Sequence, residues 1–195
     1  MYEYIKGTVA EVAPAYAVID VGGVGYYLHI SLETYSAIEH ETETRLYVHY
    51  VVREDAQVLY GFFSREERDI FRALLGVSGV GGNTARMILS AFTADEVRTI
   101  IAAGQADVLK SVKGLGIKTA QKIIVELRDK IGAVCPANEA LPLRQAADGT
   151  FDEALSALTM LGFARQASEK VLRALRKEMP AATVEELVRQ ALKRL

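Results

Sequence analysis

The middle of the chain contains Leu74-Leu-Gly-Val-Ser-Gly-Val-Gly-Gly-Asn-Thr-Ala-Arg-Met-Ile-Leu89 and, beginning 35 residues further on, Leu109-Lys-Ser-Val-Lys-Gly-Leu-Gly-Ile-Lys-Thr-Ala-Gln-Lys-Ile-Ile124. Seven of the sixteen aligned positions are identical. Both copies have the form Val-x-Gly-hydrophobic-Gly-x-x-Thr-Ala, and helical periodicity precedes and follows each copy. This repeat predicts two tandem helix–hairpin–helix units.

The two glycines of each copy predict a tight turn that can hold a phosphate. Glycine adopts backbone conformations that a side chain forbids, and the aliphatic residue between the glycines can pin the turn to the helices. We expect the N–H groups of the turn to face outward beside the start of the next helix, where the helix dipole favours an anion. Such contacts reach phosphates and not bases, so binding should be largely independent of sequence. The residues expected to bind DNA are Gly79, Val80, Gly81, Asn83, Thr84, Gly114, Leu115, Gly116, Lys118, Thr119 and Lys122.

Other glycine-rich motifs fit this repeat less well. A nucleotide-binding P-loop needs Gly-x-x-x-x-Gly-Lys-Ser/Thr, which neither copy contains. A dinucleotide-binding fingerprint follows a strand, whereas these turns follow predicted helices. One Gly-x-Gly turn can simply join two packed helices, but a repeated turn with Lys113, Lys118 and Lys122 around the second copy favours DNA binding.

Residues 1–63 are expected to form an OB-type five-stranded β-barrel, although an SH3-like barrel also fits. The predicted strands span residues 2–9, 16–21, 26–30, 45–52 and 57–62, with a short helix at 32–38. The net charge is −6 for residues 1–62, +3 for residues 63–135 and +1 for residues 136–195. The overall charge of −2 therefore conceals a basic middle region, and local potential is what governs binding to a polyanion.

Residues 64–132 are expected to form the helical DNA-binding domain. Its predicted helix boundaries are two capping boxes, Ser64 with Glu67 and Thr93 with Glu96, and two C-terminal glycines, Gly104 and Gly132.

Residues 133–150 read as a flexible linker, because they hold two prolines without sustained periodicity. Residues 151–195 are expected to form a three-helix bundle, with helices at about 151–161, 164–178 and 183–194. The predicted fold class is therefore multidomain α+β: a barrel, a tandem helix–hairpin–helix domain and a small helical bundle.

The composition excludes several classes of protein. Half of the residues are hydrophobic and 25% are charged, which rules out wholesale disorder. No apolar run reaches the ~18–20 residues that span a bilayer, and we see no secretory signal, so we expect a cytoplasmic protein. A single cysteine, Cys135, agrees with a reducing compartment. The isolated histidines His29, His40 and His49 give no metal-ligand spacing, and no nucleophile–base pair is visible, so we expect no metal, cofactor or catalysis.

These features together resemble the RuvA family. The resemblance spans the chain and rests on the acidic barrel, the run Val51-Val52-Arg53-Glu54-Asp55-Ala56-Gln57 with Leu59-Tyr60-Gly61-Phe62, the two hairpins and the detached C-terminal helices. It implies a homotetramer, or an octamer, that holds a four-way (Holliday) junction open and planar. It also implies that the hexameric RuvB ATPase is a partner and uses the ATP. The RuvC resolvase is a further candidate partner, in recombination, DNA repair and the SOS response to DNA damage.

The resemblance assigns roles to two further groups of residues. Glu54 and Asp55 lie at a predicted turn between strands, where acids are usually just solvated. In the RuvA family this turn forms an acidic pin at the centre of the junction. Residues 160–163 resemble the Met-Gly-Phe loop of ubiquitin-associated domains, so the bundle is expected to be of that kind. The residues expected to contact RuvB are Leu158, Met160, Leu161 and Phe163.

One position departs from the family pattern. Family members often have Pro-Lys after the first Gly-x-Gly, whereas this chain has Gly82-Asn83. The first hairpin has therefore lost a charge that would contribute to DNA binding.

Two other functions stay open on the sequence alone. A general duplex-binding accessory protein would use the same hairpins without preferring junctions, and a protein-interaction adaptor would use them only as structure. Four barrel tyrosines could also stack on bases, as in OB-fold readers of single strands. The negative charge of the barrel instead favours a place for them in its core or rim: Tyr4, Tyr26, Tyr47 and Tyr60.

Overall fold

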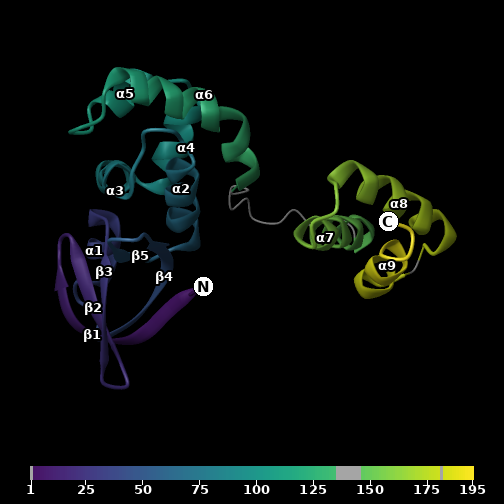
Figure 1. Cartoon of the computed structure of the whole chain (residues 1–195), viewed down its shortest axis with the longest axis horizontal. Coiled ribbons are helices and arrows are strands. Elements are labelled where there is room, and N and C mark those ends of the chain that lie inside the picture. Colours follow the sequence, from purple (N-terminus) through teal and green to yellow (C-terminus); the bar gives the residue numbers. More distant parts are fainter. Residues whose placement is uncertain (1, 135–145, 181) are drawn as a thin grey trace. The chain divides into compact units, whose positions relative to one another are not determined.

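The computed structural model describes residues 2–134, 146–180 and 182–195. They fall in two compact units, Met1–Ala137 and Asn138–Leu195, and each is described by itself (Figure 1). The elements of the first unit are β1 (Tyr4–Ala13), β2 (Tyr16–Val21), β3 (Val24–His29), α1 (Leu32–Ile38), β4 (Glu43–Val52), β5 (Gln57–Phe62), α2 (Arg65–Leu75), α3 (Gly82–Ala91), α4 (Ala94–Ala102), α5 (Ala106–Lys110) and α6 (Ile117–Val134). Those of the second unit are α7 (Ala146–Met160), α8 (Arg165–Glu178) and α9 (Val184–Ala191).

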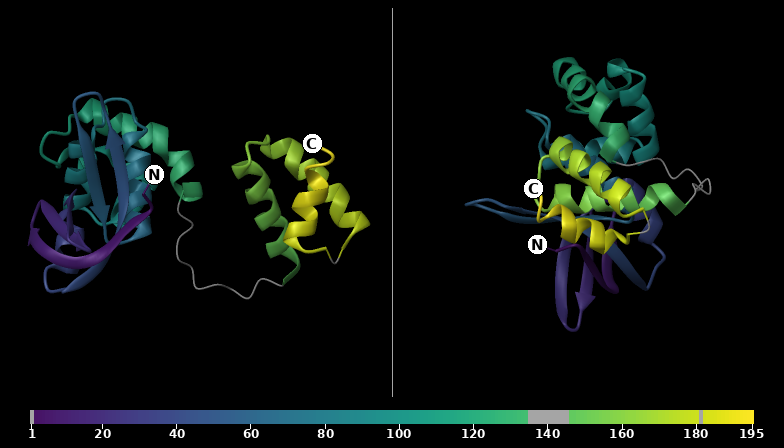
Figure 2. Two further views of the ribbon diagram at one scale, coloured as in Figure 1. Left: turned by 60° about the horizontal axis from the view of Figure 1, so that its bottom comes forward. Right: turned by 90° about the vertical axis from the view of Figure 1, so that its right-hand side faces the viewer.

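The five strands close into a barrel in the order β1-β2-β3-β5-β4 (Figure 2). β1 pairs with both β2 and β4, and a bulge between Val9 and Glu11 helps it to bend from one partner to the other. β3 pairs with β5 in parallel, and α1 connects β3 to β4. This is the arrangement of an OB-type barrel, so that expectation is confirmed over the SH3-like alternative.

Alternate residues of the strands bury their side chains in the barrel core. Ile19 of β2 and Leu28 of β3 are fully buried in its core, while their chain neighbours point outward. Gly22 and Gly23 have φ angles of +62° and +91°, and a two-residue hairpin turn of this twist needs both. β2 and β3 therefore form a hairpin, paired from Tyr16–His29 to Val21–Val24.

Helices α2 to α6 pack around a core that continues into one end of the barrel. Phe71 of α2 lies against Tyr60 and Phe62 of β5, with its ring centroid 4.8 Å from each of theirs. Val80 and Leu115, the aliphatic residues of the two hairpins, belong to this same core. The barrel and the hairpins are therefore joined by shared apolar packing and not only by the chain.

The sequence signals for helix ends hold at α4 but not at α6. Thr93 and Glu96 form the expected reciprocal capping box, and Gly104, with a φ of +71°, follows the end of the helix. Helix α6 continues past Gly132 to Val134. A helical glycine costs only about 1 kcal/mol, which a packed helix tolerates.

The capping box expected at α2 is only half present. The Ser64 hydroxyl accepts the Glu67 N–H at 3.0 Å, as expected. The Glu67 carboxylate does not accept the Ser64 N–H, as a full capping box would require. Glu67 is 1% exposed, and its carboxylate accepts hydrogen bonds from the hydroxyls of Ser31 and Thr34. The Thr34 hydroxyl in turn accepts the Phe63 N–H at 3.0 Å. Glu67 therefore ties α2 to α1, which sequence spacing could not show.

Burial of Glu67 should make the stability of the fold depend on pH. Desolvation raises its pKa from 4.5 to about 7, against the lowering effect of the two hydroxyl donors. Between those values the folded chain holds a proton that the unfolded chain releases, so stability falls as pH rises. From pH 5 to pH 8, we expect the stability of the wild type relative to Glu67→Gln to fall by about 2–3 kcal/mol. Urea denaturation of both proteins at each pH measures this, and parallel pH profiles would contradict it.

The C-terminal unit is a three-helix bundle in the residues that are described, as expected. Its core holds Leu158, Leu172 and Leu175, all fully buried. Helix α7 begins at Ala146, so residues 146–150, which were expected in the linker, are helical. Residues 133 and 134, also expected in the linker, belong to α6, and residues 135–145 lie outside the described residues. Among the described helices, none is both long and apolar enough to cross a membrane.

Candidate nucleic-acid interface

The two repeated turns have the same backbone. Gly79 and Gly114 have φ angles of +92° and +85°, a region that favours glycine over other residues. Val80 and Leu115 follow them and are only 6% exposed. Each turn is thus bent by its first glycine and anchored by the aliphatic residue after it, as the sequence predicted.

One part of the predicted phosphate site is wrong. The N–H groups of Val80 and Leu115 do not face outward, because each donates to a carbonyl within its own turn. Val80 bonds to Val77 and Leu115 to Val112, both at 3.0 Å. The donors that suit a phosphate are therefore those at the start of the following helix, where N–H groups lack partners within the helix.

The second glycine of each turn has no structural explanation within the chain. A Cβ atom added to Gly81 or Gly116 would meet nothing within 4 Å, and neither residue has a left-handed φ. Gly81 is the N-cap of α3 and Gly116 directly precedes α6, so any side chain there would stand before a helix N-terminus. Space for an external group accounts for these glycines better than packing does.

The helices after the two turns also lack the acids that other helices of this unit carry. Helices α1, α2 and α4 begin with a Ser or Thr cap and have acidic residues in the first turn. Helix α3 has neither a side-chain cap nor an acid, and α6 has no acid in its first turn and follows Gly116. These two N-termini are therefore open to an anion, with their dipoles uncompensated.

Side chains add charge at the second hairpin more than at the first. Lys118 and Lys122, with Lys113 before the turn, are exposed around the start of α6. At the first hairpin Asn83 is exposed and uncharged. The remaining predicted residues, Thr84 and Thr119, are half-buried in the first turns of α3 and α6.

Tyr60 explains why Gly82 stands where members of the RuvA family often have proline. A Cβ atom on Gly82 would lie 2.2 Å from the hydroxyl oxygen of Tyr60, which packs beneath the first hairpin. No side chain fits between them unless Tyr60 moves. Tyr60 was expected in the barrel core or rim and is buried there at 9% exposure, but its contact with the hairpin could not be predicted from the sequence.

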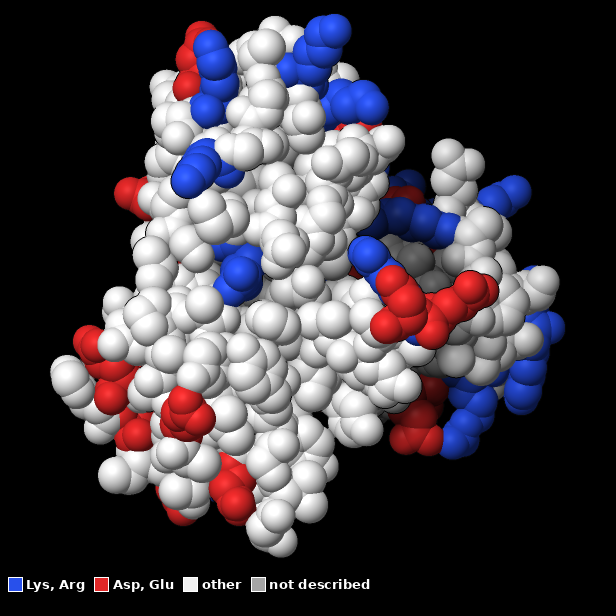
Figure 3. All heavy atoms as spheres, turned by 60° about the vertical axis from the view of Figure 1, so that its left-hand side comes forward, with Lys and Arg blue, Asp and Glu red and all other residues white. Residues whose placement is uncertain are grey.

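Charge is divided between the two parts of this unit. On the face shown in Figure 3, Lys and Arg side chains lie mostly over the helical upper part, and Asp and Glu side chains gather over the barrel below. A polyanion is therefore attracted to the hairpins and repelled by the barrel.

Glu54 and Asp55 lie at a turn, as predicted, and both are exposed. They lie in the connection between β4 and β5, which the Arg53 N–H closes by donating to the Ala56 carbonyl at 2.8 Å. In the right-hand view of Figure 2 this hairpin projects beyond the rest of the barrel. Two adjacent carboxylates at its exposed tip form a compact negative charge.

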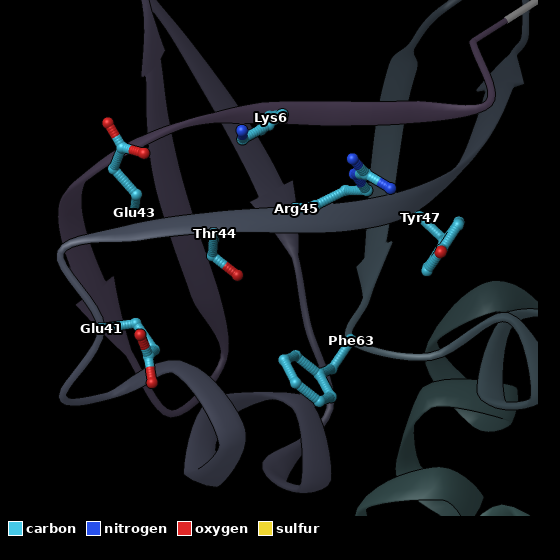
Figure 4. A pocket seen from close by; sticks show the side chains of 7 residues that line it. All are labelled: Lys6, Glu41, Glu43, Thr44, Arg45, Tyr47 and Phe63. Carbon is cyan, nitrogen blue, oxygen red and sulfur yellow. The ribbon is translucent and has the colours of Figure 1, made fainter.

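A hollow of about 470 Å³ on the barrel has no excess of positive charge in its lining that would attract DNA (Figure 4). It pairs two cations with two acids and borders an exposed aromatic ring: Lys6, Glu41, Glu43, Thr44, Arg45, Tyr47 and Phe63. Nearby, Arg45 lies over the Tyr4 ring and Arg65 over the Tyr47 ring, at 4.7 and 5.3 Å from the centroids. These tyrosines belong to the barrel rim, in agreement with the sequence analysis.

The residues expected to contact a protein partner divide into two groups. Met160 and Leu161 are 87% and 60% exposed at the end of α7, next to a turn at Gly162 with a φ of +95°. Phe163 is half-buried against the bundle core. Leu158 is fully buried, so its expected place on the contact surface is wrong.

Metal-ligating groups are not gathered anywhere in residues 2–134, 146–180 and 182–195. His29 and His49 lie in barrel strands, and burial holds the pKa of each below its ordinary value. The His29 ring packs near Tyr60 and the His49 ring near Phe71, so both take part in the packing of this unit.

Family models match three parts of the chain. They are described as RuvA N terminal domain (residues 1–61), SAM-like helix-hairpin-helix tandem (residues 71–129) and RuvA, C-terminal domain (residues 150–195). A protein of Bacteroides thetaiotaomicron is 51% identical and proteins of Porphyromonas gingivalis and Christiangramia forsetii are each 43% identical, over the full length of both chains. All three are named Holliday junction branch migration complex subunit RuvA.

The fold and the two open helix N-termini define a tandem helix–hairpin–helix protein with an OB-type barrel and a C-terminal helical bundle. With full-length identities of up to 51%, the chain belongs to the RuvA family.

Proposed function

We propose that this chain binds four-way junction DNA without sequence preference, as the DNA-binding subunit of a branch migration complex. The observation that carries the proposal is the pair of uncapped, acid-free helix N-termini behind Gly81 and Gly116. Each offers backbone N–H groups to a phosphate and makes no contact that reads a base. The names of the relatives support the junction as the DNA structure.

The assembly and the partners extend this proposal. A homotetramer would place four copies of the Glu54–Asp55 turn around one axis, facing the point where strands exchange. A RuvB motor would dock on the C-terminal bundle and hydrolyse the ATP, so this chain needs no cofactor and performs no catalysis. RuvC, an octamer, an SOS role and a cytoplasmic location are further parts of the proposal and rest on the family alone.

Neutralising the acidic turn tests the choice between junction and duplex. Carboxylates repel phosphates, so acids at the centre of a DNA-binding face lower affinity there and favour one DNA shape over another. For Glu54→Gln/Asp55→Asn, we expect junction affinity to stay the same or rise and linear-duplex affinity to rise severalfold more. Both affinities are measured at one fixed salt concentration.

The matched control removes two acids from the opposite end of β4. Glu41→Gln/Glu43→Gln makes the same change in net charge far along the strand from the turn. It should leave the ratio of junction to duplex affinity unchanged. A preserved ratio in the Glu54/Asp55 variant would show that these are ordinary turn residues and would favour a general duplex-binding protein.

A further inference from the structure

The guanidinium of Arg86, on α3, is directed toward the barrel and not toward the solvent around the first hairpin. Its Nη1 donates to the carbonyl oxygens of Ala15 and Ile30, at 2.9 and 3.3 Å. Its Nε is shielded from solvent. The same guanidinium helps burial to hold the pKa of His29 down, which places its charge beside β3. Arg86 follows the Gly82-Asn83 turn closely in the chain, but these contacts direct its charge toward the barrel.

A second side chain of α3 reaches the same part of the barrel. The Ser90 hydroxyl accepts the Leu32 N–H, at 3.1 Å, at the start of α1. It also donates to the Arg86 carbonyl oxygen at 2.9 Å, so the two residues lie on one face of α3. We call Arg86 and Ser90, with the barrel groups that they bind, the α3 clasp.

The clasp gives the helical region a second attachment to the barrel. The first attachment is made by α2, which follows β5 directly in the chain and packs Phe71 against the barrel residues Tyr60 and Phe62. Polar contacts reinforce it, from Glu67 to Ser31 and Thr34 and from Arg68 to Glu3. The clasp holds the barrel through a different helix, so it restrains rotation of the helical region about α2. The clasp therefore fixes where the first hairpin stands relative to the acidic turn.

We propose that Arg86 is a positioning residue for DNA selection: with Ser90 it sets the placement of the hairpins against the Glu54–Asp55 turn, and it does not bind phosphate. This inference rests on the proposed function, because selectivity requires both the hairpins and the acidic turn to meet one DNA. It has a consequence for the first hairpin, which then holds its phosphate through backbone groups without a neighbouring cation from α3.

Arg86→Met tests the proposal, since methionine keeps the aliphatic stem and removes both donated hydrogen bonds. We expect the ratio of junction to duplex affinity to fall about tenfold, as the loss of charge-assisted hydrogen bonds allows. We expect the salt dependence of duplex binding to stay unchanged, because no phosphate contact is lost. Lys118→Ala is the comparison that should lower that salt slope by about one.

Ser90→Ala is the neutral counterpart, and it keeps the test decisive if Arg86→Met does not fold. It removes the link to Leu32 without changing charge, so it should lower the same ratio by a smaller factor at an unchanged salt slope. A lower slope with uniformly weaker binding in Arg86→Met would make Arg86 a phosphate ligand and overturn the proposal. An unchanged ratio in both variants, or in Ser90→Ala where only that variant folds, would also overturn it. If the wild type itself shows no junction preference, the proposed function fails instead, and the slopes still decide whether Arg86 binds phosphate.

Discussion

A chain that ends at Val134 is expected to bind junction DNA with unchanged affinity and to lose all stimulation of RuvB. The reason is that the two compact units have separate cores. The hairpins and the barrel share one set of buried residues, and helices α7 to α9 bury Leu158, Leu172 and Leu175 among themselves. Removing the second unit therefore removes none of the buried residues that support the barrel and the hairpins. Junction affinity and RuvB-driven branch migration, measured on the same preparation, test both halves of this expectation.

A milder variant of the full chain locates the contact surface. Met160 and Leu161 are exposed, so Met160→Ser/Leu161→Ser should leave the bundle folded and reduce RuvB stimulation strongly. Val125, 76% exposed on α6 in the other unit, provides the matched control as Val125→Ser. Branch migration by the truncated chain at the wild-type rate would refute the assignment of the C-terminal bundle to RuvB.

Much of the fold was accessible from the sequence because its signals are local. The five strands and the short helix were predicted close to their observed bounds, and the doubled Gly-x-Gly motif predicted both turns between helices. Each of these signals depends on residues that are close in the chain. The short helix between the third and fourth strands favoured an OB-type barrel, but only the strand order of the structure excludes the SH3-like alternative.

The errors arose where a side chain has a partner far along the chain. Glu67 has the spacing of a capping residue, yet its partners Ser31 and Thr34 come from α1, more than 30 residues earlier. Arg86 received no role from the sequence, because its partners are carbonyl oxygens of the barrel that lie more than 50 residues earlier in the chain. Propensity and spacing describe what a residue can do locally, and burial decides which of those options is used.

The two glycines of each repeated turn are present for different reasons, which the residue type alone does not show. The first glycine of each turn is required by its backbone, since Gly79 and Gly114 have positive φ angles. The second is not, since Gly81 and Gly116 have ordinary backbone angles and open space around a would-be Cβ atom. One sequence motif therefore holds two glycines that are present for different reasons.

That difference leads to the largest effect expected on DNA binding. Gly81→Ala/Gly116→Ala should keep the fold, because each added methyl group enters empty space. The same methyl groups stand before the N-termini of α3 and α6, where they keep a phosphate from the backbone N–H groups. Hydrogen bonds to a charged group contribute about 1.5–3 kcal/mol each, so we expect junction affinity to fall at least ~100-fold for the pair. Electrophoretic mobility shift titrations of both proteins at one salt concentration measure the change.

Gly79→Ala/Gly114→Ala is the control that separates strain from access. Here the methyl group has room but the backbone is left-handed, at a cost of roughly 1–2 kcal/mol per residue. This variant should therefore lose thermal stability, whereas the Gly81/Gly116 variant should keep its thermal stability and lose affinity for junction DNA. Lys118→Ala removes one exposed charge and no backbone donor. It should weaken DNA binding less than Gly116→Ala, the replacement before the same helix. If Gly81→Ala/Gly116→Ala binds the junction as the wild type does, the helix N-termini are not the phosphate site, and the exposed lysines of α6 must supply the affinity alone.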